Sequence, residues 1–190
     1  MERAKKRALY SLLAFRLEVG PKAGPNDEVG LAFDFLASIE DTGPGSVLTG
    51  HDNGLITLNV AEADASEREK MRAAMGENYR TLLGHFRHEL GHYYWDRLIR
   101  DDPGRLRAFR DLFGDETADY EAALAAHYAN GAPVDWQESH ISAYAASHPW
   151  EDWAESFAHY LHITDTLEMV RSLKLPLGEL ETVEAADLPA

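Results

Sequence analysis

The sequence predicts a single α+β domain in which a small sheet, mixed or antiparallel, precedes a mostly helical half. Its 190 residues are 45% hydrophobic, which is enough apolar surface for one compact core. Segments with strand character lie before residue 65, and segments with helical periodicity fill most of the rest. We expect one domain over residues 1–190, with the acidic, weakly patterned tail from about residue 175 loosely packed.

The N-terminal segment predicts a helix. Residues 2–17 carry apolar positions at helical spacing, and the Gly/Pro-rich loop GPKAGPND follows them. The segment has basic residues but no small-residue cleavage site, and no apolar run approaches the roughly 20 residues that span a bilayer. We interpret it as the amphipathic first helix of a cytoplasmic protein.

Strands follow this loop. The segment LAFDFLA alternates apolar and polar residues, and SVLTGHDNGLITLNV predicts two strands joined by a tight turn. The turn contains Asn53-Gly54, a pair that tolerates positive φ angles. We expect residues 55–60 to form an edge strand on which an extended peptide can lie by β-augmentation.

Helix signals dominate the second half. Ser66 and Glu69 match a capping box at the start of a mostly helical stretch to about residue 100, with Gly76 and Gly84 as candidate breaks. Prolines, glycines and capping residues predict three later helices. These helices begin after Asp102, at Asp115 and after Ser147, and end near Gly114, Asn130 and His162 respectively.

The composition narrows the classes of function. Acidic residues outnumber basic ones by 33 to 18, and the net charge of −15 repels phosphate backbones and anionic membranes. We expect no nucleic-acid or membrane partner, and an acidic surface that serves solubility or favours cationic or neutral peptides. The chain has no cysteine, so thiol chemistry is excluded and a metal site can use only His, Asp and Glu.

The segment His88-Glu89-Leu90-Gly91-His92 is an HExxH sequence inside the first predicted helical stretch. Positions i and i+4 share a helix face, so both imidazoles can reach one metal ion, and Glu89 can accept a proton from a metal-bound water. Zinc lowers the pKa of bound water from about 15.7 to about 7, which makes a nucleophile at neutral pH. A chance match is the alternative, since the chain has nine histidines. The apolar flanks favour the metal site, because buried unpaired polar groups cost several kcal/mol.

A catalytic zinc site needs a third protein ligand. The motif extended by a third histidine is excluded, because Leu98 stands at the required position. The best candidate is Glu151, in the first turn of the last helix, whose i+4 partner Glu155 can accept the free N–H of a ligating histidine. The competing candidates are Glu155, His148 and His140. We therefore predict one Zn²⁺ ion bound by Glu151 and the two motif histidines.

The two motifs resemble those of the gluzincins, HExxH peptidases whose third ligand is a glutamate on a later helix with an acidic residue four positions on. HELGH and EDWAE match this arrangement. The runs GHFRHELGHYYWDRL and PWEDWAESFAHYLH are more closely similar to a bacterial family of zinc-binding metallopeptidases, and TGHDNGLITLNVAEAD extends the similarity over most of the chain. The resemblance implies a zincin-like metallopeptidase domain that acts on a peptide or protein substrate.

Two further comparisons qualify this resemblance. Members of the bacterial family often carry an N-terminal cysteine-rich zinc ribbon, which this cysteine-free chain lacks, so we interpret it as an isolated or trimmed catalytic domain. In anthrax lethal factor, a gluzincin, a tyrosine seven positions before the ligand glutamate assists catalysis. Tyr144 occupies that offset here.

The resulting hypothesis is zinc-dependent peptide hydrolysis. Glu89 takes a proton from the water and passes it to the leaving amine, and Tyr144 or His148 donates a hydrogen bond to the oxyanion. Two alternatives stay open: a non-catalytic interaction module in which zinc staples the two motif helices, and an HExxH hydrolase of a non-peptide amide. Glu89 argues against the first, since a structural site needs no base. We expect the remaining conspicuous residues to pack, bond locally or line turns: His51, His85, His159, Tyr93, Tyr94 and Trp95.

Overall fold

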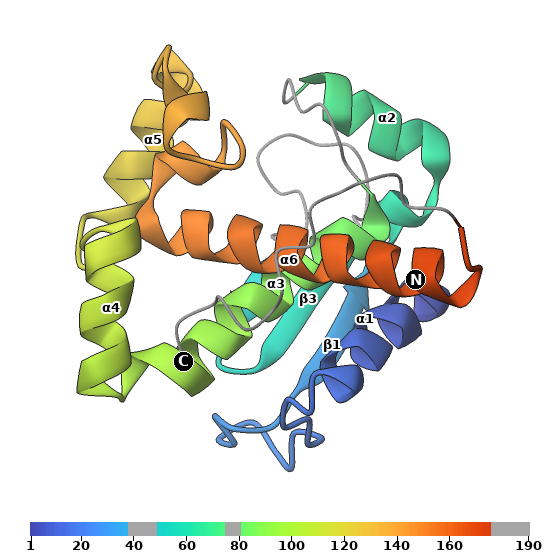
Figure 1. Cartoon of the computed structure of the whole chain (residues 1–190). Coiled ribbons are helices and arrows are strands. Elements are labelled where there is room, and N and C mark those ends of the chain that lie inside the picture. The colour runs from blue at the N-terminus through green and yellow to red at the C-terminus, as the bar shows by residue number, and fades with distance from the viewer. Residues whose placement is uncertain (38–48, 75–80, 176–190) are drawn as a thin grey trace.

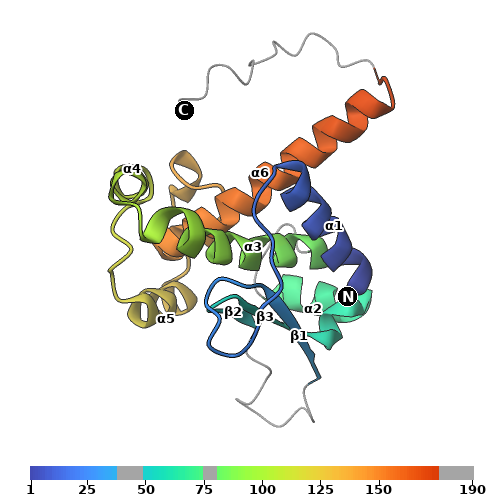
Figure 2. The same ribbon diagram turned by 90° about the horizontal axis from the view of Figure 1, so that it is seen from below.

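Helix α3 (Leu82–Trp95) occupies the centre of the structure, with α6 (Pro149–Ser172) crossing one side and the sheet on the other, while α1 (Glu2–Ala14) lies beside α3 and the C-terminal half of α6 (Figures 1 and 2). This computed structural model describes residues 1–37, 49–74 and 81–175. The architecture is α+β, with the strands in the first third of the chain and helices in the rest, as the sequence predicts. The tail after residue 175 lies outside the described residues.

The sheet has three strands in the order β1-β3-β2: β1 (Ala32–Leu36), β2 (Gly50–Asp52) and β3 (Leu55–Asn59). Strand β3 pairs in parallel with β1 and antiparallel with β2. The β2–β3 turn is the predicted tight hairpin, in which Asn53 has φ 45° and Gly54 has φ 83°. The expectation that residues 55–60 form an edge strand is wrong, because β1 occupies the side of β3 that β2 leaves free.

The helical segments that follow the sheet are mostly short. After β3 come a 3₁₀ turn η1 (Val60–Ala63) and α2 (Ala65–Ala74), and α3 continues into a π-helical turn η2 (Asp96–Arg100). Helices α4 (Pro103–Phe113) and α5 (Tyr120–Asn130) follow. Two 3₁₀ turns, η3 (Trp136–Glu138) and η4 (Ala145–Ser147), then lead into α6.

Several helix starts differ from the prediction by a few residues. Asp102 caps α4 and Gly114 follows its end, as predicted. The start of α2 is capped by Asp64 rather than Ser66, because Asp64 Oδ1 accepts the backbone N–H groups of Ser66 and Glu67. Gly84 does not break α3; it lies in the first turn and donates its N–H to the capping hydroxyl of Thr81.

The last two helices also begin with other caps than predicted. Asp119 caps α5, while Asp115 accepts the N–H of Thr117 in the preceding turn. His148 caps α6, while the hydroxyl of Ser147 donates to the Tyr144 carbonyl. In both cases, a neighbouring polar side chain with better geometry takes the cap, which sequence spacing alone does not decide.

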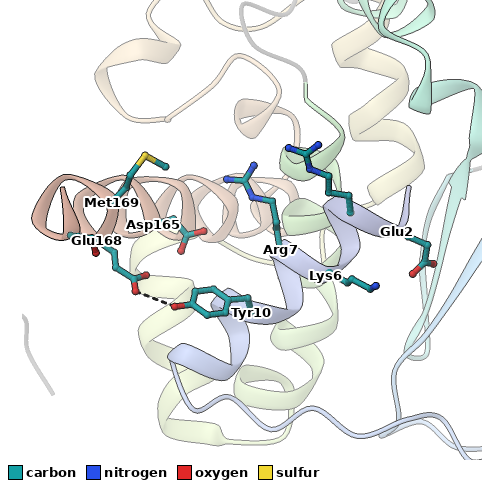
Figure 3. A pocket seen from close by; sticks show the side chains of 9 residues that line it. Glu2, Lys6, Arg7, Tyr10, Asp165, Glu168 and Met169 are labelled. Carbon is teal, nitrogen blue, oxygen red and sulfur yellow. Dashed lines mark hydrogen bonds between the residues drawn. The ribbon is translucent and has the colours of Figure 1, made fainter.

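Helix α6 extends well past the predicted end at His162 because its second half packs along α1. Ser11 Oγ donates to Asp165 Oδ2 at 2.8 Å, and Tyr10 donates to Glu168 Oε1 at 3.1 Å. The open hollow between the two helices, which contains Tyr10, Asp165 and Glu168, is shown in Figure 3. It shares no residue with the HExxH motif.

Two apolar clusters bury α3 on several sides. The larger cluster joins α1, the sheet, α3 and α6, and within it Phe86 packs edge-on against Phe33 and Phe35. The smaller cluster comprises Trp95, Ile99 and Phe109, with partly buried side chains of α4 and α6 around it. The HExxH motif is therefore located in the protein interior, as its apolar flanks predict, and the aromatic residues after it are core. The larger cluster contains Ala8, Leu12, Leu31, Ile56, Leu58, Phe86, Leu90, Tyr93, Tyr94 and Leu161.

Within the described ranges, no helix has both the length and the apolar character that a membrane crossing requires.

Candidate metal centre

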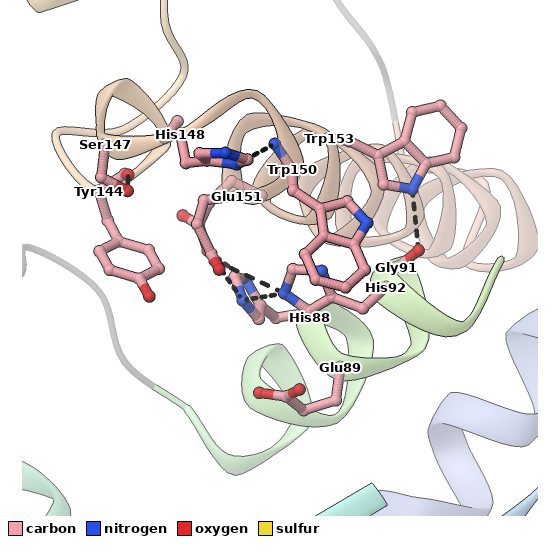
Figure 4. Close-up of polar contacts among 12 residues, drawn as sticks. His88, Glu89, Gly91, His92, Tyr144, Ser147, His148, Trp150, Glu151 and Trp153 are labelled. Atoms are coloured by element: carbon pink, nitrogen blue, oxygen red, sulfur yellow. Dashed lines mark hydrogen bonds and ion pairs between the residues drawn. The ribbon is translucent and has the colours of Figure 1, made fainter. Parts of the chain in front are cut away.

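The close crossing of α3 and α6 brings the two sequence motifs together. Gly91, inside HExxH, faces Ala154 on α6, and a Cβ atom added to Gly91 would lie 2.8 Å from Ala154 Cα. Trp153 fixes the same crossing, because its indole Nε1 donates to the Gly91 carbonyl at 2.8 Å (Figure 4). Glu151 lies one turn before Ala154, so this contact carries its carboxylate to the motif histidines.

Three ligand atoms meet at this crossing. Glu151 Oε2 lies 3.0 Å from His88 Nε2 and 3.5 Å from His92 Nε2, and the two Nε2 atoms lie 3.2 Å apart. The exposed fraction of Glu151 is only 1%, and its Oε2 has no hydrogen-bond partner among the described residues. Figure 4 shows the two imidazoles and the carboxylate pointing toward one another.

These three residues fit a zinc ion. Two imidazoles and a carboxylate are a common ligand set of catalytic zinc, and bonds of about 2.0–2.1 Å in tetrahedral geometry separate the ligand atoms by about 3.3 Å. The measured separations bracket that value. A cation would also satisfy the buried oxygen of Glu151, which otherwise lacks a partner. Within the described residues, His88, His92 and Glu151 form the one group of three or more side chains arranged to hold a metal ion.

Glu155 lies behind His88. Its Oε1 accepts from His88 Nδ1 at 2.8 Å, and its Oε2 accepts from the hydroxyl of Ser142 at 2.8 Å. This leaves His88 Nε2 to face Glu151, which is the arrangement that the i+4 spacing of Glu151 and Glu155 predicts. Burial alone would lower the pKa of His88, but the adjacent carboxylate of Glu151 and the hydrogen bond to Glu155 raise that pKa well above the ordinary value in the metal-free site.

Tyr120 is a contact that the sequence did not predict. Its hydroxyl, on α5, donates to Glu151 Oε1 at 2.5 Å, leaving Oε2 for the two histidines. Burial and the charge of Glu151 raise the pKa of Tyr120, so the phenol keeps its proton at neutral pH. Tyr120 lies outside both motifs and at no recognisable spacing from them, so no signal in the sequence points to it.

Glu89 projects from α3 beside the two histidines (Figure 4). Its side chain is buried, and its Oε1 lies 3.2 Å from His85 Nε2. Burial raises the pKa of Glu89, but the hydrogen bond from His85 and the charge of His88 outweigh it and lower the pKa to about 2. An ionised carboxylate in this position can accept a proton from a neighbouring water.

The two predicted hydrogen-bond donors differ in their placement. The Tyr144 ring lies 6.0 Å from the His88 ring, centroid to centroid. Burial and the charge of Glu151 raise the pKa of Tyr144, so its hydroxyl is a donor at neutral pH. His148 has a different place from the one predicted: its Nδ1 accepts from Trp150 N, and its Nε2 lies 3.1 Å from the Ala118 carbonyl. Both ring nitrogens are engaged with the backbone, since Nδ1 caps α6 and Nε2 contacts the segment before α5.

The other candidate histidines also lie outside the three-residue group. His140 Nε2 lies 3.8 Å from Asp152 Oδ2 rather than beside the two motif histidines. His51 Nε2 accepts the N–H of Gly54 and so closes the β-hairpin, in line with the predicted turn role. His159 bonds to the carbonyl of Glu155 in its own helix, a local contact as expected.

Residues 1–189 match a protein family described as "putative zinc-binding metallo-peptidase". Uncharacterized proteins of Mycobacterium bovis and Mycobacterium tuberculosis are each 50% identical to this chain over 167 residues. The match covers 88% of this chain and 48% of each relative, so the chain spans about half the length of the curated relatives it matches. No solved structure matches the chain significantly.

Proposed function

Because the chain belongs to the zinc-binding metallo-peptidase family, we propose that it is a zinc-dependent peptidase in which Glu89 is the general base. The observation that carries the proposal is the convergence of His88 Nε2, His92 Nε2 and Glu151 Oε2, within 4.8 Å of one another, beside the ionised Glu89. Zinc held there would supply Lewis-acid chemistry, polarising a scissile carbonyl and acidifying water.

The residues around this site have separate roles in hydrolysis. Glu89 accepts a proton from the attacking water and delivers it to the leaving amine. Tyr144 donates a hydrogen bond from its protonated hydroxyl to the oxygen that becomes negative. Tyr120 holds Glu151, and Glu155 holds His88, so the ligand atoms keep their orientation through the reaction.

Strand β2 has an outer edge that is a candidate binding site for the substrate. It packs against α3 and pairs with β3 on one side, and within the described ranges no strand pairs with its other side. An extended peptide can add to such an edge through main-chain hydrogen bonds, which favour peptides over other amides. The β-augmentation expected from the sequence therefore moves from β3 to β2.

A non-catalytic zinc site is less consistent with these features. A structural site closes the fourth position with a fourth protein ligand, whereas the described residues supply a group of three. A structural site also has no use for a buried ionised glutamate next to its ligands. Hydrolysis of a non-peptide amide would use the same residues. Assays with different substrates therefore distinguish it from peptide hydrolysis.

The test compares the wild-type chain with Glu89→Gln, both loaded with zinc, on unstructured protein and peptide mixtures. We expect both proteins to hold one zinc ion and only the wild type to release new amino termini. The matched control is Glu67→Gln, which removes an exposed glutamate that pairs with Lys70, and it should keep full activity. Hydrolysis by pure Glu89→Gln at the wild-type rate would contradict the role of Glu89.

A further inference from the structure

His85 lies between two buried carboxylates. Its Nδ1 is 2.7 Å from Glu62 Oε2, and its Nε2 is 3.2 Å from Glu89 Oε1. The side chain of His85 is 12% exposed, and those of Glu62 and Glu89 are 2% and 7% exposed. The three side chains thus form a buried hydrogen-bonded row that ends on the proposed general base.

The chemistry of the row fixes the state of its middle member. Ionised carboxylates only accept hydrogen bonds, so both ring nitrogens of His85 must donate, which requires the imidazolium form. Burial lowers the pKa of His85, but the hydrogen bonds to Glu62 and Glu89 overcome this effect and raise it to about 9. Charge-assisted hydrogen bonds of this kind are about twice as strong as neutral ones.

The row also connects the base to the sheet. His85 lies one helical turn before Glu89 on α3, so the two side chains share a face. Glu62 belongs to η1, which follows β3 directly. Its backbone is fixed by Arg68, whose Nη1 donates to the Glu62 carbonyl at 2.6 Å, and by the cap of η1, where Asn59 accepts from Ala61 N.

We propose that His85 and Glu62 position the catalytic base: His85 holds Oε1 of Glu89, and Glu62 holds His85, so that Oε2 of Glu89 is presented to the water. The inference rests on the proposed function, because it gives the row a purpose only if Glu89 is the base. His85 and Glu62 are positioning residues, since neither belongs to the metal-binding group.

If the row only stabilised the fold, the hydrogen bond between His85 and Glu89 would not be needed. The bond between His85 and Glu62 alone would tie η1 to α3. Within the described ranges, His85 is the hydrogen-bond partner of the Glu89 side chain, so the row determines how that carboxylate is oriented. A base that must meet a water in one geometry gains rate from such preorganisation, and small misplacements can cost about 10²-fold.

The experiment uses the whole chain loaded with zinc and compares wild type, His85→Gln, Glu62→Gln and the surface control Glu67→Gln. We expect both row variants to bind one zinc ion and to show a kcat reduced on the order of 10- to 100-fold, with KM unchanged. The control should match the wild type. A loss of stability in the row variants is compatible with either role, so kcat decides: a purely structural role would leave kcat of the folded, zinc-loaded fraction intact.

A second readout needs no turnover. Nitrogen-15 NMR of the wild-type protein at pH 7 should show both ring nitrogens of His85 protonated, and Glu89→Gln should perturb the Nε2 signal more than the Nδ1 signal. This measurement also decides the case if His85→Gln fails to fold or to hold zinc.

The outcomes separate the two proposals. Wild-type kcat in folded, zinc-loaded His85→Gln, or a ring nitrogen of His85 without a proton, overturns the positioning role and leaves the peptidase proposal standing. A wild-type protein that binds zinc but hydrolyses no peptide overturns the proposed function and the purpose of the row together. Reduced kcat with retained zinc and a doubly protonated ring supports both.

Discussion

Gly91 of α3 lies directly against Ala154 of α6, and the space between them is too small for a side-chain carbon. A Cβ atom on Gly91 would stand 2.8 Å from Ala154 Cα and 3.2 Å from its carbonyl oxygen, both backbone atoms that cannot turn away. Gly91, the second of the two variable residues in the HExxH motif, therefore sets the distance at which Glu151 meets His88 and His92.

Gly91→Ala should separate the two helices. Overpacking of a buried contact costs about 1–3 kcal/mol, and we expect this loss of stability together with weaker zinc binding, because Glu151 moves with α6. Thermal unfolding and a competition titration against a zinc chelator measure the two effects. The control is Gly24→Ala, at a position with open space around it. Wild-type zinc affinity in Gly91→Ala would show that the crossing does not set the site geometry.

Glu151 and Glu155 should differ in their effect on bound zinc. Glu151→Ala removes a ligand atom, and we expect elemental analysis to find no stoichiometric zinc in that variant. Glu155→Gln leaves the three ligand atoms and alters only the hydrogen bond to His88 Nδ1, so the affinity should fall by about 10- to 100-fold. Equal zinc content in wild type and Glu151→Ala would remove Glu151 from the ligand set.

Tyr120→Phe tests the contact that the sequence did not predict. The change deletes a hydrogen bond to a charged group, worth about 1.5–3 kcal/mol, and frees Glu151 Oε1. We expect zinc affinity to fall by about 10- to 100-fold in a chelator competition. Tyr10→Phe, which deletes a hydroxyl bonded to Glu168 on the exposed side of α6, is the control and should leave zinc affinity unchanged.

Tyr144→Phe should act on turnover and leave the metal in place. If the hydroxyl stabilises the oxyanion, its loss lowers kcat by about 10²- to 10³-fold with little change in KM. Steady-state kinetics on any peptide that the wild type cleaves, combined with zinc analysis, measures both. An unchanged kcat in Tyr144→Phe would show that the Tyr144 hydroxyl does not stabilise the oxyanion.

The row of Glu62, His85 and Glu89 predicts a pH dependence of stability in the metal-free protein. The pKa of His85 is about 9 in the folded state, above its ordinary value of 6.5, so its contribution is complete below pH 6.5 and lost as the pH rises through 9. The gap in unfolding free energy between wild type and His85→Gln should shrink by up to about 3 kcal/mol from pH 6 to pH 9.5. Chemical denaturation at the two pH values measures it, and a constant gap would contradict the charged row.

The sequence alone indicated the features that depend on neighbours along the chain. The i and i+4 spacing of His88 and His92 puts both imidazoles on one helix face, the Asn53-Gly54 pair makes the hairpin, and Asp102 with Pro103 starts α4. The i+4 spacing of Glu151 and Glu155 likewise suggested two separate tasks for two carboxylates. Each of these patterns involves residues no more than four positions apart in the sequence, so the local geometry of a helix or turn is sufficient to interpret it.

Only the tertiary structure decided which distant groups meet. The crossing at Gly91 and Ala154 selects Glu151 from the candidates that the sequence left open. Helix α5 supplies Tyr120 and η1 supplies Glu62, and neither contact follows from spacing. The same holds for β3, whose central place depends on where β1 pairs. These contacts join segments that packing brings together, and packing depends on the fit of many side chains at once rather than on the period of any one segment.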